Sequence, residues 1–535
     1  MDIEMSELEA ILERVKDRLS QEEYDTLHAV FETLMFMTEE LGKKQVSIQR
    51  LKRLLFGATT EKTRDILQQA LGNAGAGSDT GKGGTPGSRP PKDKPPGHGR
   101  NGADAYQGAR TVEVSHPTLH GGDTCPSCKK GKVYETAEPG RMVRVHGQAP
   151  LGATVYELQK LRCNLCGEIF TAPTPPGVGS EKYDAESASM IALLKYGSGV
   201  PFNRLQRLEG SLGIPLPAAT QWEIVRDTAR TIEPVFKAMI HQAAQGRVLH
   251  NDDTTMKILE LMKQRRELME AESAQKPERT GVFTSGVLSV LDDYRISLFF
   301  TGHHHAGENL MALLKQRASE LGPPIQMCDA LSRNMPAELN TILANCLTHG
   351  RRQFVDVAMN FPQECLYVLE TLKDVYTNDA EAKSQNLSPE QRLKWHQEQS
   401  GPKMDELKTW MTDQIEQHKV EPNCSLGDAI TYMLKHWEPL TLFLRVAGAP
   451  LDNNVCEAAL KKAILHRKNA YFYKTQNGAR VGDLFMSLIH TCELNKLNAF
   501  EYLTALQKNA SRLASAPDAW LPWNYRGTLQ KASAC

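Results

Sequence analysis

The sequence predicts a multidomain α/β protein, and three observations support this class. The chain has 535 residues and 40% hydrophobic content, which is enough for several domains that each bury a core. Apolar segments of strand length alternate with helical patterns between residues 246 and 349. A segment rich in Gly and Pro, followed by two cysteine pairs, separates that region from helical sequence at the N-terminus. No apolar stretch is long enough to suggest a membrane helix.

Residues 1–71 are expected to form a helical hairpin or a short coiled coil, because apolar side chains recur there at helical spacing. A coiled coil would support oligomerisation, but helices packing within one chain would give the same pattern, so both readings stay open. Residues 72–108 are rich in Gly, Pro, Ser and Lys and contain few large apolar side chains. Such a composition predicts a flexible linker.

Two Cys-x₂-Cys pairs indicate a small zinc ribbon within residues 109–178. The pairs are Cys125 with Cys128 and Cys163 with Cys166. Four thiolates on paired tight turns match a structural, tetrahedral Zn²⁺ site, and the segment Arg141 to Leu161 is expected to form a hairpin between the pairs. A disulfide is disfavoured, because the chain shows no signal peptide and its other cysteines are scattered, which suggests a reducing cytosol.

Residues 179–245 show amphipathic helical patterns between the zinc ribbon and the predicted sheet. They are expected to form a helical module that either binds DNA or braces the fold, and a helix-turn-helix is one arrangement that fits.

The predicted sheet begins at Val248–Leu259, whose centre carries the adjacent acids Asp252 and Asp253. Because neighbours on a strand point to opposite faces, only one of these acids can face a common site, and the other is expected in solvent or in a turn. Further elements are expected in the following order: a charged insertion at Glu260–Arg279, strands at Gly281–Leu291 and Tyr294–Thr301, a helix at Ala306–Arg317, a strand at Pro323–Asp329, a helical stretch, and a strand at Leu343–His349.

Histidines lie near the ends of two predicted strands. His303, His304 and His305 are interpreted as a polar strand end rather than a metal site, because adjacent residues on a strand cannot all face one ion. His349 is expected to end a strand that runs beside the Asp252 strand. The neighbouring Arg351 or Arg352 could neutralise a phosphate group, and a packing or salt-bridge role fits them equally well.

Residues 355–445 are largely helical and interrupt the predicted sheet region. A helix capped by Asp452 or Asn453 then places Glu457 directly ahead of a cationic tract. Between Glu457 and Asp483 the tract has no acid and contains Lys461, Lys462, Arg467, Lys468, Lys474 and Arg480. Such a cluster fits a polyanion, whereas the simpler reading is a surface pair between Glu457 and Lys461. Residues 491–535 are expected to form a C-terminal helix and tail.

These motifs resemble the transposase of the IS66 family of insertion sequences. The resemblance rests on His250 to Thr254, Cys346 to Phe354 and Asp452 to Asn469, and it spans most of the chain. It implies a ribonuclease H-like catalytic core of the DDE type at residues 246–490, with a helical insertion at about 355–445 and a zinc-binding domain upstream. The family usually has a glutamate at the position of Asp253, and the residues after Asp329 also depart from its pattern.

Carried over by position, the resemblance assigns the catalytic and metal-binding triad to Asp252, Asp329 and Glu457. Two Mg²⁺ or Mn²⁺ ions held by such carboxylates can activate a water or a 3′-hydroxyl and stabilise the leaving oxygen at phosphorus. The residues expected to contact DNA are Lys461, Arg467, Lys468, Arg351 and Arg352.

The function that the resemblance implies is that of a DNA transposase. Such an enzyme binds the terminal repeats of its element, cleaves them in a metal-dependent reaction and joins the 3′-OH to target DNA. Its expected partners are double-stranded DNA, further copies of the same chain and small accessory proteins of the element, in the bacterial cytoplasm at the nucleoid. Two alternatives remain: an inactive zinc-containing DNA-binding regulator or scaffold, and a hydrolytic nuclease without strand transfer.

Overall fold

The computed structural model describes the chain mainly from residue 103 onward. The described residues are Tyr24, 103–105, 109, 111–136, 141–145, 149–162, 164–166, 168–179, 181–270, 279, 281–336 and 340–534. The predicted coiled coil and linker therefore lie outside them, apart from Tyr24 and Ala103–Ala105. The chain divides into two units, one of residues Ser78–Pro150 and one of Met1–Gly77 with Leu151–Cys535.

The strands are β1 Lys160–Arg162, β2 Ile169–Thr171, β3 Val248–Thr255, β4 Phe283–Val290, β5 Arg295–Gly302, β6 Ile325–Cys328 and β7 Ile342–Asn345. The helices up to β7 are η2 Ala103–Ala105, α4 Ala185–Ala192, η3 Leu193–Gly197, α5 Phe202–Ser211, α6 Ala218–Ala244, α7 Leu259–Glu270, α8 Ala306–Leu314 and η4 Ser332–Asn334. Those that follow are α9 Leu347–Val357, α10 Pro362–Ser384, α11 Pro389–Gln399, α12 Gly401–Glu416, α13 Ser425–Lys435, α14 Trp437–Leu440, η5 Leu442–Leu444, α15 Asn454–Ala470, α16 Gln476–Leu494, α17 Ala499–Lys508, α18 Ala510–Leu513, η6 Pro517–Trp520 and α19 Tyr525–Ala534.

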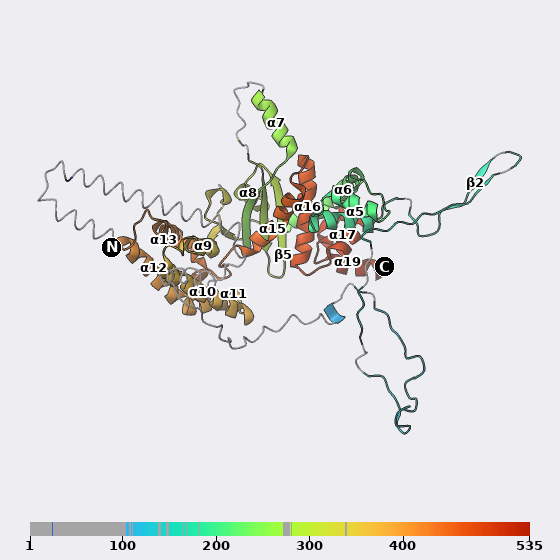
Figure 1. Ribbon diagram of the computed structural model, residues 1–535, viewed down its shortest axis with the longest axis horizontal. Helices are drawn as coiled ribbons and strands as arrows, with labels where there is room; N and C mark the ends of the chain where they lie inside the picture. Colours follow the sequence, from blue (N-terminus) through green and yellow to red (C-terminus); the bar gives the residue numbers. More distant parts are fainter. Residues whose placement is uncertain are drawn as a thin grey trace, which may run out of the picture. The chain divides into compact units, whose positions relative to one another are not determined.

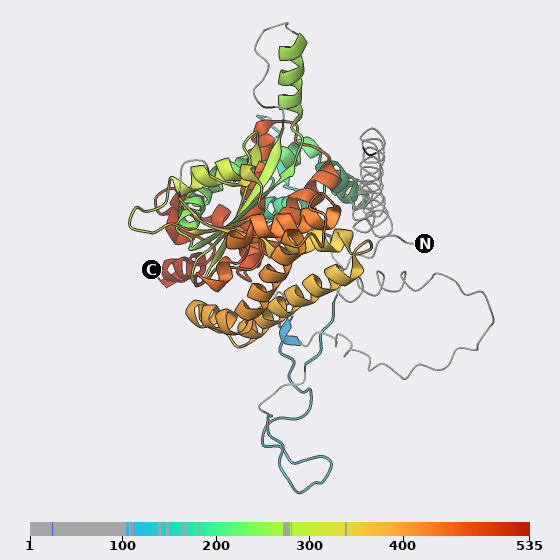
Figure 2. The same cartoon turned by 90° about the vertical axis from the view of Figure 1, so that its left-hand side faces the viewer.

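A five-stranded sheet with the order β5-β4-β3-β6-β7 forms the centre of the larger unit. β4 is antiparallel to both β3 and β5, whereas β6 is parallel to β3 and β7 is parallel to β6. The predicted hairpin between β4 and β5 is confirmed, with the Leu291 N–H donating to the Tyr294 carbonyl at 2.9 Å. The charged insertion after β3 contains α7, which extends away from the sheet in both views (Figures 1 and 2).

The end of the sheet differs from the sequence prediction. The strand expected at Leu343–His349 stops at Asn345, and α9 begins at Leu347. This strand pairs with β6, which separates it from β3, so it does not run beside the Asp252 strand. His349 therefore lies in the first turn of a helix. Short apolar runs fit either a strand or a buried helix, which explains the error.

The link between β6 and β7 is a second difference. A helical stretch was expected there, and the described residues contain only the 3₁₀ helix η4.

Helix α16 covers the outer edge of the sheet at β5. Four of its side chains accept hydrogen bonds from alternate N–H groups of the strand: Asp483 from Thr301 at 2.7 Å, Ser487 from Phe299 at 2.9 Å, Thr491 from Ser297 at 3.1 Å and Asn495 from Arg295 at 3.1 Å. Four residues advance a helix by about 6 Å and two residues advance a strand by about 6.7 Å. The two spacings therefore stay in step, and the outward N–H groups of an edge strand find partners.

Two apolar cores lie on either side of the sheet. One is formed by β3 to β5 with α4, α6, α16 and α17, and includes Ile232, Phe299 and Phe485. The other is formed by β6 and β7 with α9, α10 and α12 to α14, and includes Phe354 and Leu369. Figure 1 shows these two helical groups flanking the strands. Among the described residues, no helix is both long and apolar enough to cross a membrane.

Candidate active site

Asp252 lies in the middle of β3, opposite Gly286 of β4. Its carboxylate accepts the Asp253 N–H at 2.8 Å. A Cβ atom at Gly286 would come within 3.1 Å of the Leu460 side chain of α15. The glycine therefore allows α15, which carries Glu457, to pack closely against the strands that carry Asp252.

The start of α15 is tied to β3 next to Asp252. The Asn453 side chain pairs with the His250 ring Nδ1 at 3.0 Å and donates to the Asn251 carbonyl at 3.2 Å. Asn453 is the N-cap residue of α15, one of the two residues predicted for this position, and the Asp452 carboxylate before it accepts the Asn454 N–H at 3.1 Å. Because buried hydrogen bonds hold Asn453 against residues 250 and 251, Glu457, one turn later, has a defined position relative to Asp252.

Among the described residues, Glu457 has no lysine or arginine partner. Its Oε1 atom is buried and makes no hydrogen bond with the described residues, and its one ion-pair contact is His349 Nε2 at 3.8 Å. The ion pairs of the described residues do not include Glu457 with Lys461, so the simple reading of a surface pair is not what the structure shows.

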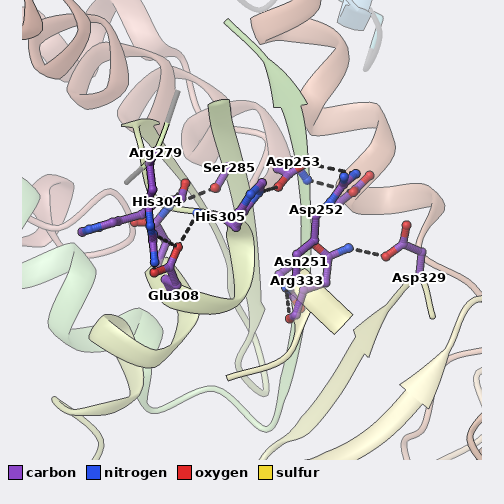
Figure 3. A network of polar contacts seen from close by, with 12 residues as sticks. Asn251, Asp252, Asp253, Arg279, Ser285, His304, His305, Glu308, Asp329 and Arg333 are labelled. Carbon is purple, nitrogen blue, oxygen red and sulfur yellow. Dashed lines mark hydrogen bonds and ion pairs between the residues drawn. The ribbon is translucent and has the colours of Figure 1, made fainter. Parts of the chain in front are cut away.

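Asp329 follows β6 and is held by the loop that succeeds it. The Asn334 side chain donates to the Asp329 carboxylate, and the Leu331 N–H lies 3.4 Å from the same oxygen. The Asn334 carbonyl in turn accepts Asn251 Nδ2 at 2.7 Å and Gln326 Nε2 at 2.8 Å. Figure 3 shows Asp329 on the same side of β3 as Asp252. The loop is thus fastened to the central strand.

The charges around Asp252 are not compensated. Burial raises its pKa to about 7, and the negative charges of Asp329, Asp253 and Glu457 add to this, whereas the Asp253 N–H opposes it. Within the described part of the chain, no ion pair joins Asp252, Asp329 or Glu457 to a lysine or arginine. Carboxylates gathered in this way are hard oxygen ligands that suit Mg²⁺.

The three carboxylates do not converge on a single point. The one set of three potential metal ligands whose donor atoms all lie within 4.8 Å, among the described residues, is Cys346, His349 and Glu457. The triad named from the resemblance is therefore electrostatically linked but too spread out for one ion to bind all three members.

Asp253 points to the opposite face of β3, and the expectation that it lies in solvent or a turn is wrong. Its side chain is 3% exposed and accepts from His305 Nδ1 at 2.8 Å, with Arg333 at 3.6 Å (Figure 3). His305 caps α8, and Arg333 lies in the loop after Asp329. Sequence reasoning missed this contact because 52 residues separate Asp253 from His305.

The basic residues of α15 have different environments. Arg467 donates to Thr254 at 3.2 Å and to Thr255, so it fastens the helix to β3. Lys462 pairs with Glu493 at 2.9 Å. Lys461 and Lys468 are exposed, and the ion pairs of the described chain include neither of them. Arg351 and Arg352 lie on α9 and are half-buried.

The first cysteine pair forms a tight turn within the Ser78–Pro150 unit. The Cys125 carbonyl accepts the Lys129 N–H at 2.9 Å, and Cys128 Sγ accepts the Gly131 N–H at 3.4 Å. Hydrogen bonds from Gly131, Lys130 and Cys125 lower the pKa of the Cys128 thiol. A sulfur that accepts backbone N–H groups suits a thiolate ligand of zinc.

Of the second cysteine pair, Cys166 belongs to the other unit, is exposed and lies between β1 and β2, which pair antiparallel. Cys163 lies outside the described residues. The hairpin expected at Arg141 to Leu161 is not what the structure shows, because within the described residues of 141–161 strand structure occurs only at the start of β1. β1 pairs instead with β2, which follows Cys166.

A comparison with models of protein families identifies the family to which this chain is related. A model described as "Transposase IS66 family" matches residues 182–481, which is more than half of the sequence. The chain belongs to the IS66 transposase family. The matched region of this IS66 family member contains the whole five-stranded sheet, the helices from α4 to α15, and Asp252, Asp329 and Glu457.

Three proteins of Sinorhizobium fredii are similar to this IS66 family member. Uncharacterized protein y4jD is 31% identical over 188 residues, which is 34% of this chain and 36% of that protein. Uncharacterized protein y4hP is 24% identical over 446 residues, covering 78% of this chain and 75% of that protein. Uncharacterized protein y4qI is 26% identical over 34% of each chain. The aligned region thus spans about a third of the length of two of these relatives.

Proposed function

We propose that this IS66 family member is a DDE transposase that binds the terminal repeats of its element, cleaves the DNA strand and joins the 3′-OH to target DNA. The observation that carries the proposal is the uncompensated set of Asp252, Asp329 and Glu457. Asp252 lies on β3, Asp329 directly follows the neighbouring parallel strand β6, and Glu457 lies on a helix packed against β3 and β4. Membership in a transposase family supports a DNA-cutting reaction at this set.

The topology supports a ribonuclease H-like core. Three consecutive antiparallel strands are followed by two parallel strands on the other side of the first strand. In the resembling DDE enzymes such a sheet carries one acid on its first strand, one after its fourth strand and one on a later helix. Asp252, Asp329 and Glu457 occupy these three places.

The residues present fit divalent cations at this site, because Asp329 and Glu457 are close enough to raise the pKa of Asp252 and one oxygen of Glu457 lacks a partner among the described residues. Asp252 would be shared between two ions, with Asp329 and Glu457 each completing one. Bound Mg²⁺ would supply charge stabilisation at phosphorus and a deprotonated nucleophile at neutral pH.

Other residues of the chain would position the substrate and the site. Lys461 and Lys468 follow Glu457 along α15 and are exposed, so they would contact the phosphate backbone. Arg467 would act through its hydrogen bonds to Thr254 and Thr255, which hold α15 against β3. Arg351 and Arg352, on the helix that carries His349, are proposed to face the same DNA. A zinc ribbon of Cys125, Cys128, Cys163 and Cys166 would brace the N-terminal side or contact DNA.

A strand-transfer assay tests the proposal. Purified protein with Mg²⁺ is incubated with DNA that carries the element ends and a target plasmid, and Glu457→Gln and Asp252→Asn are assayed in parallel. We expect joined products that vanish in both variants, while binding to the end DNA persists. Specific DNA binding without metal-dependent cleavage by the unaltered chain, even with accessory proteins of the element, would contradict the enzyme and favour a regulator. Cleavage without joined products would indicate a nuclease.

A further inference from the structure

Two helix N-termini bring a second kind of metal ligand to Glu457. Cys346 is the N-cap residue of α9, and His349 lies three residues later, on the same side of the first turn. Glu457 lies in the first turn of α15. The thiol, an imidazole nitrogen and a carboxylate oxygen of these residues all lie within 4.8 Å of one another. None of the roles derived above uses Cys346 or His349.

Two polar atoms of this cluster lack partners within the described protein. His349 Nδ1 and Glu457 Oε1 are both buried without a hydrogen bond. His349 Nε2 faces Glu457 Oε1 at 3.8 Å, which is too long for a hydrogen bond. Buried polar groups without partners are costly. Glu457 Oε1 is such a group and faces the His349 ring across this gap, which points to a group that binds between them.

Cys346 is already arranged as a ligand. Its sulfur accepts the backbone N–H of Asn453 at 3.2 Å, and the side chain is fully buried. That hydrogen bond joins the start of α15 to the start of α9, so the sulfur and Glu457 are held by the same short segment. Burial raises the pKa of the Cys346 thiol to about 11, and the N–H groups of Asn453 and His349 oppose this rise. The thiolate is therefore expected only with a bound cation.

We propose that Cys346, His349 and Glu457 bind one thiophilic divalent cation of the Zn²⁺ class. Sulfur and imidazole ligands select zinc-like ions, whereas Mg²⁺ requires oxygen ligands. On a tetrahedral zinc with bonds of about 2.0 to 2.3 Å, donor atoms lie roughly 3.3 to 3.6 Å apart, so small side-chain rotations close the observed 3.8 Å. Binding replaces the thiol proton of Cys346 with the metal and releases that proton to solvent. Three protein ligands leave the fourth position to water.

Such an ion competes for Glu457, a consequence that rests on the proposed function. While a zinc-class ion holds Glu457, the carboxylate cannot complete the Mg²⁺ set with Asp252. The cluster would therefore make strand cleavage sensitive to inhibition by Zn²⁺, and excess Mg²⁺ would relieve this inhibition only weakly, because Mg²⁺ does not compete for sulfur.

Cobalt binding tests the site without any need for DNA or activity. The full-length chain, purified with its cysteine pairs loaded with zinc, is titrated with Co²⁺ while the sulfur-to-cobalt charge-transfer absorption is followed. We expect the unaltered protein to bind one added equivalent, the signal to be lost in Cys346→Ala, and the affinity to fall more than about 10-fold in His349→Gln and in Glu457→Gln. Cys365→Ala is the matched control, since Cys365 is equally buried and belongs to no metal-ligand set among the described residues.

The outcomes separate this site from the proposed function. Equal cobalt spectra in the unaltered protein and in Cys346→Ala, with thermal unfolding showing both folded, would overturn the site. An unchanged affinity in Glu457→Gln would remove Glu457 from it. Where strand transfer is measured, each protein is compared with its own zinc-free activity, and Cys346→Ala should need more than about 10-fold more Zn²⁺ for half-inhibition. A chain without strand transfer that still binds cobalt through Cys346 would refute the transposase proposal alone.

Discussion

Two buried carboxylates, Asp379 in the helical insertion and Asp252 on the central strand, have opposite surroundings. Asp379 contacts Arg392 at 2.5 Å, Lys383 at 2.7 Å and His396 at 3.2 Å. Asp252 has three carboxylates nearby and no cationic partner in the described chain. One acid is neutralised by neighbouring cations, and the other by none that the described residues supply.

The pKa values of the two groups express this difference. Burial alone would raise the pKa of Asp379, but hydrogen bonds from His396 and Lys383 and the charge of Arg392 outweigh burial and hold the pKa below its usual value. At Asp252 burial and the neighbouring charges act in the same direction and raise the pKa to about 7. A buried acid that is surrounded by cations stabilises the fold through their ion pairs. A buried acid among other acids destabilises the folded state, and a bound cation would offset this loss.

The largest stability effect is expected from Asp379→Asn. Removing the charge leaves Arg392 and the buried His396 without their partner, and breaking a buried pair in this way costs roughly 3–5 kcal/mol. Denaturant unfolding measures the change. The exposed Asp374, paired with Lys403, gives the control Asp374→Asn, with an expected cost below about 1 kcal/mol. Asp252→Asn should instead leave stability unchanged or raise it in metal-free buffer at neutral pH. Equal losses in Asp379→Asn and Asp252→Asn would contradict the comparison.

Asp483 sharpens the comparison, because it is buried without a cation and without neighbouring acids that raise its pKa. Burial raises its pKa from 3.8 to about 7, partly offset by hydrogen bonds from Thr301. The folded state therefore binds the proton more tightly than the unfolded state. This contribution to stability is fully present below pH 3.8 and is lost as the pH rises to about 7, with a slope of up to about 1.4 kcal/mol per pH unit.

Measuring the free energy of unfolding as a function of pH tests whether stability falls as the pH rises, as expected for Asp483. Asp483→Asn keeps the side-chain shape and should remove the slope that Asp483 contributes. Asp252 contributes a slope of the same sign in metal-free buffer, and Mg²⁺ should abolish that slope while leaving the one from Asp483. A slope in Asp483→Asn equal to that of the unaltered protein would show that Asp483 is already ionised in the fold.

Much of the sheet could be predicted from sequence, and part of the site could not. β3, β4 and β5 are long and β-rich, so their pattern is clear, and the hairpin at Asp292 and Asp293 follows from it. The start of α9 was misplaced because Cys346 to Thr348 fits either a strand or a helix. The hydrogen bond between Asp253 and His305 depends on how separate elements pack, which no local spacing records. His349 near Glu457 was missed for the same reason.

Helix α16 shows a signal that was present in the sequence but not interpreted. Asp483, Ser487, Thr491 and Asn495 recur every four residues, which places four polar side chains on one helix face. That face is buried against β5, where an apolar stripe is the usual expectation. A polar stripe on an otherwise apolar helix can therefore mark a helix that covers a strand edge.

A smaller loss of stability than that of Asp379→Asn is expected from Ser487→Ala, which breaks a neutral buried contact instead of a charged one. The Ser487 hydroxyl accepts the Phe299 N–H at 2.9 Å and donates to the Asp483 carbonyl at 2.6 Å. Alanine leaves the strand N–H buried without a partner, which costs about 1–3 kcal/mol. The exposed Ser515, bonded to Arg512, supplies the control Ser515→Ala. Amide exchange reads the same contact directly: Phe299 should exchange faster in Ser487→Ala than in the control. Unchanged exchange at Phe299 would mean that pairing with α16 does not protect the strand edge, and that packing of the two apolar cores alone closes the sheet there.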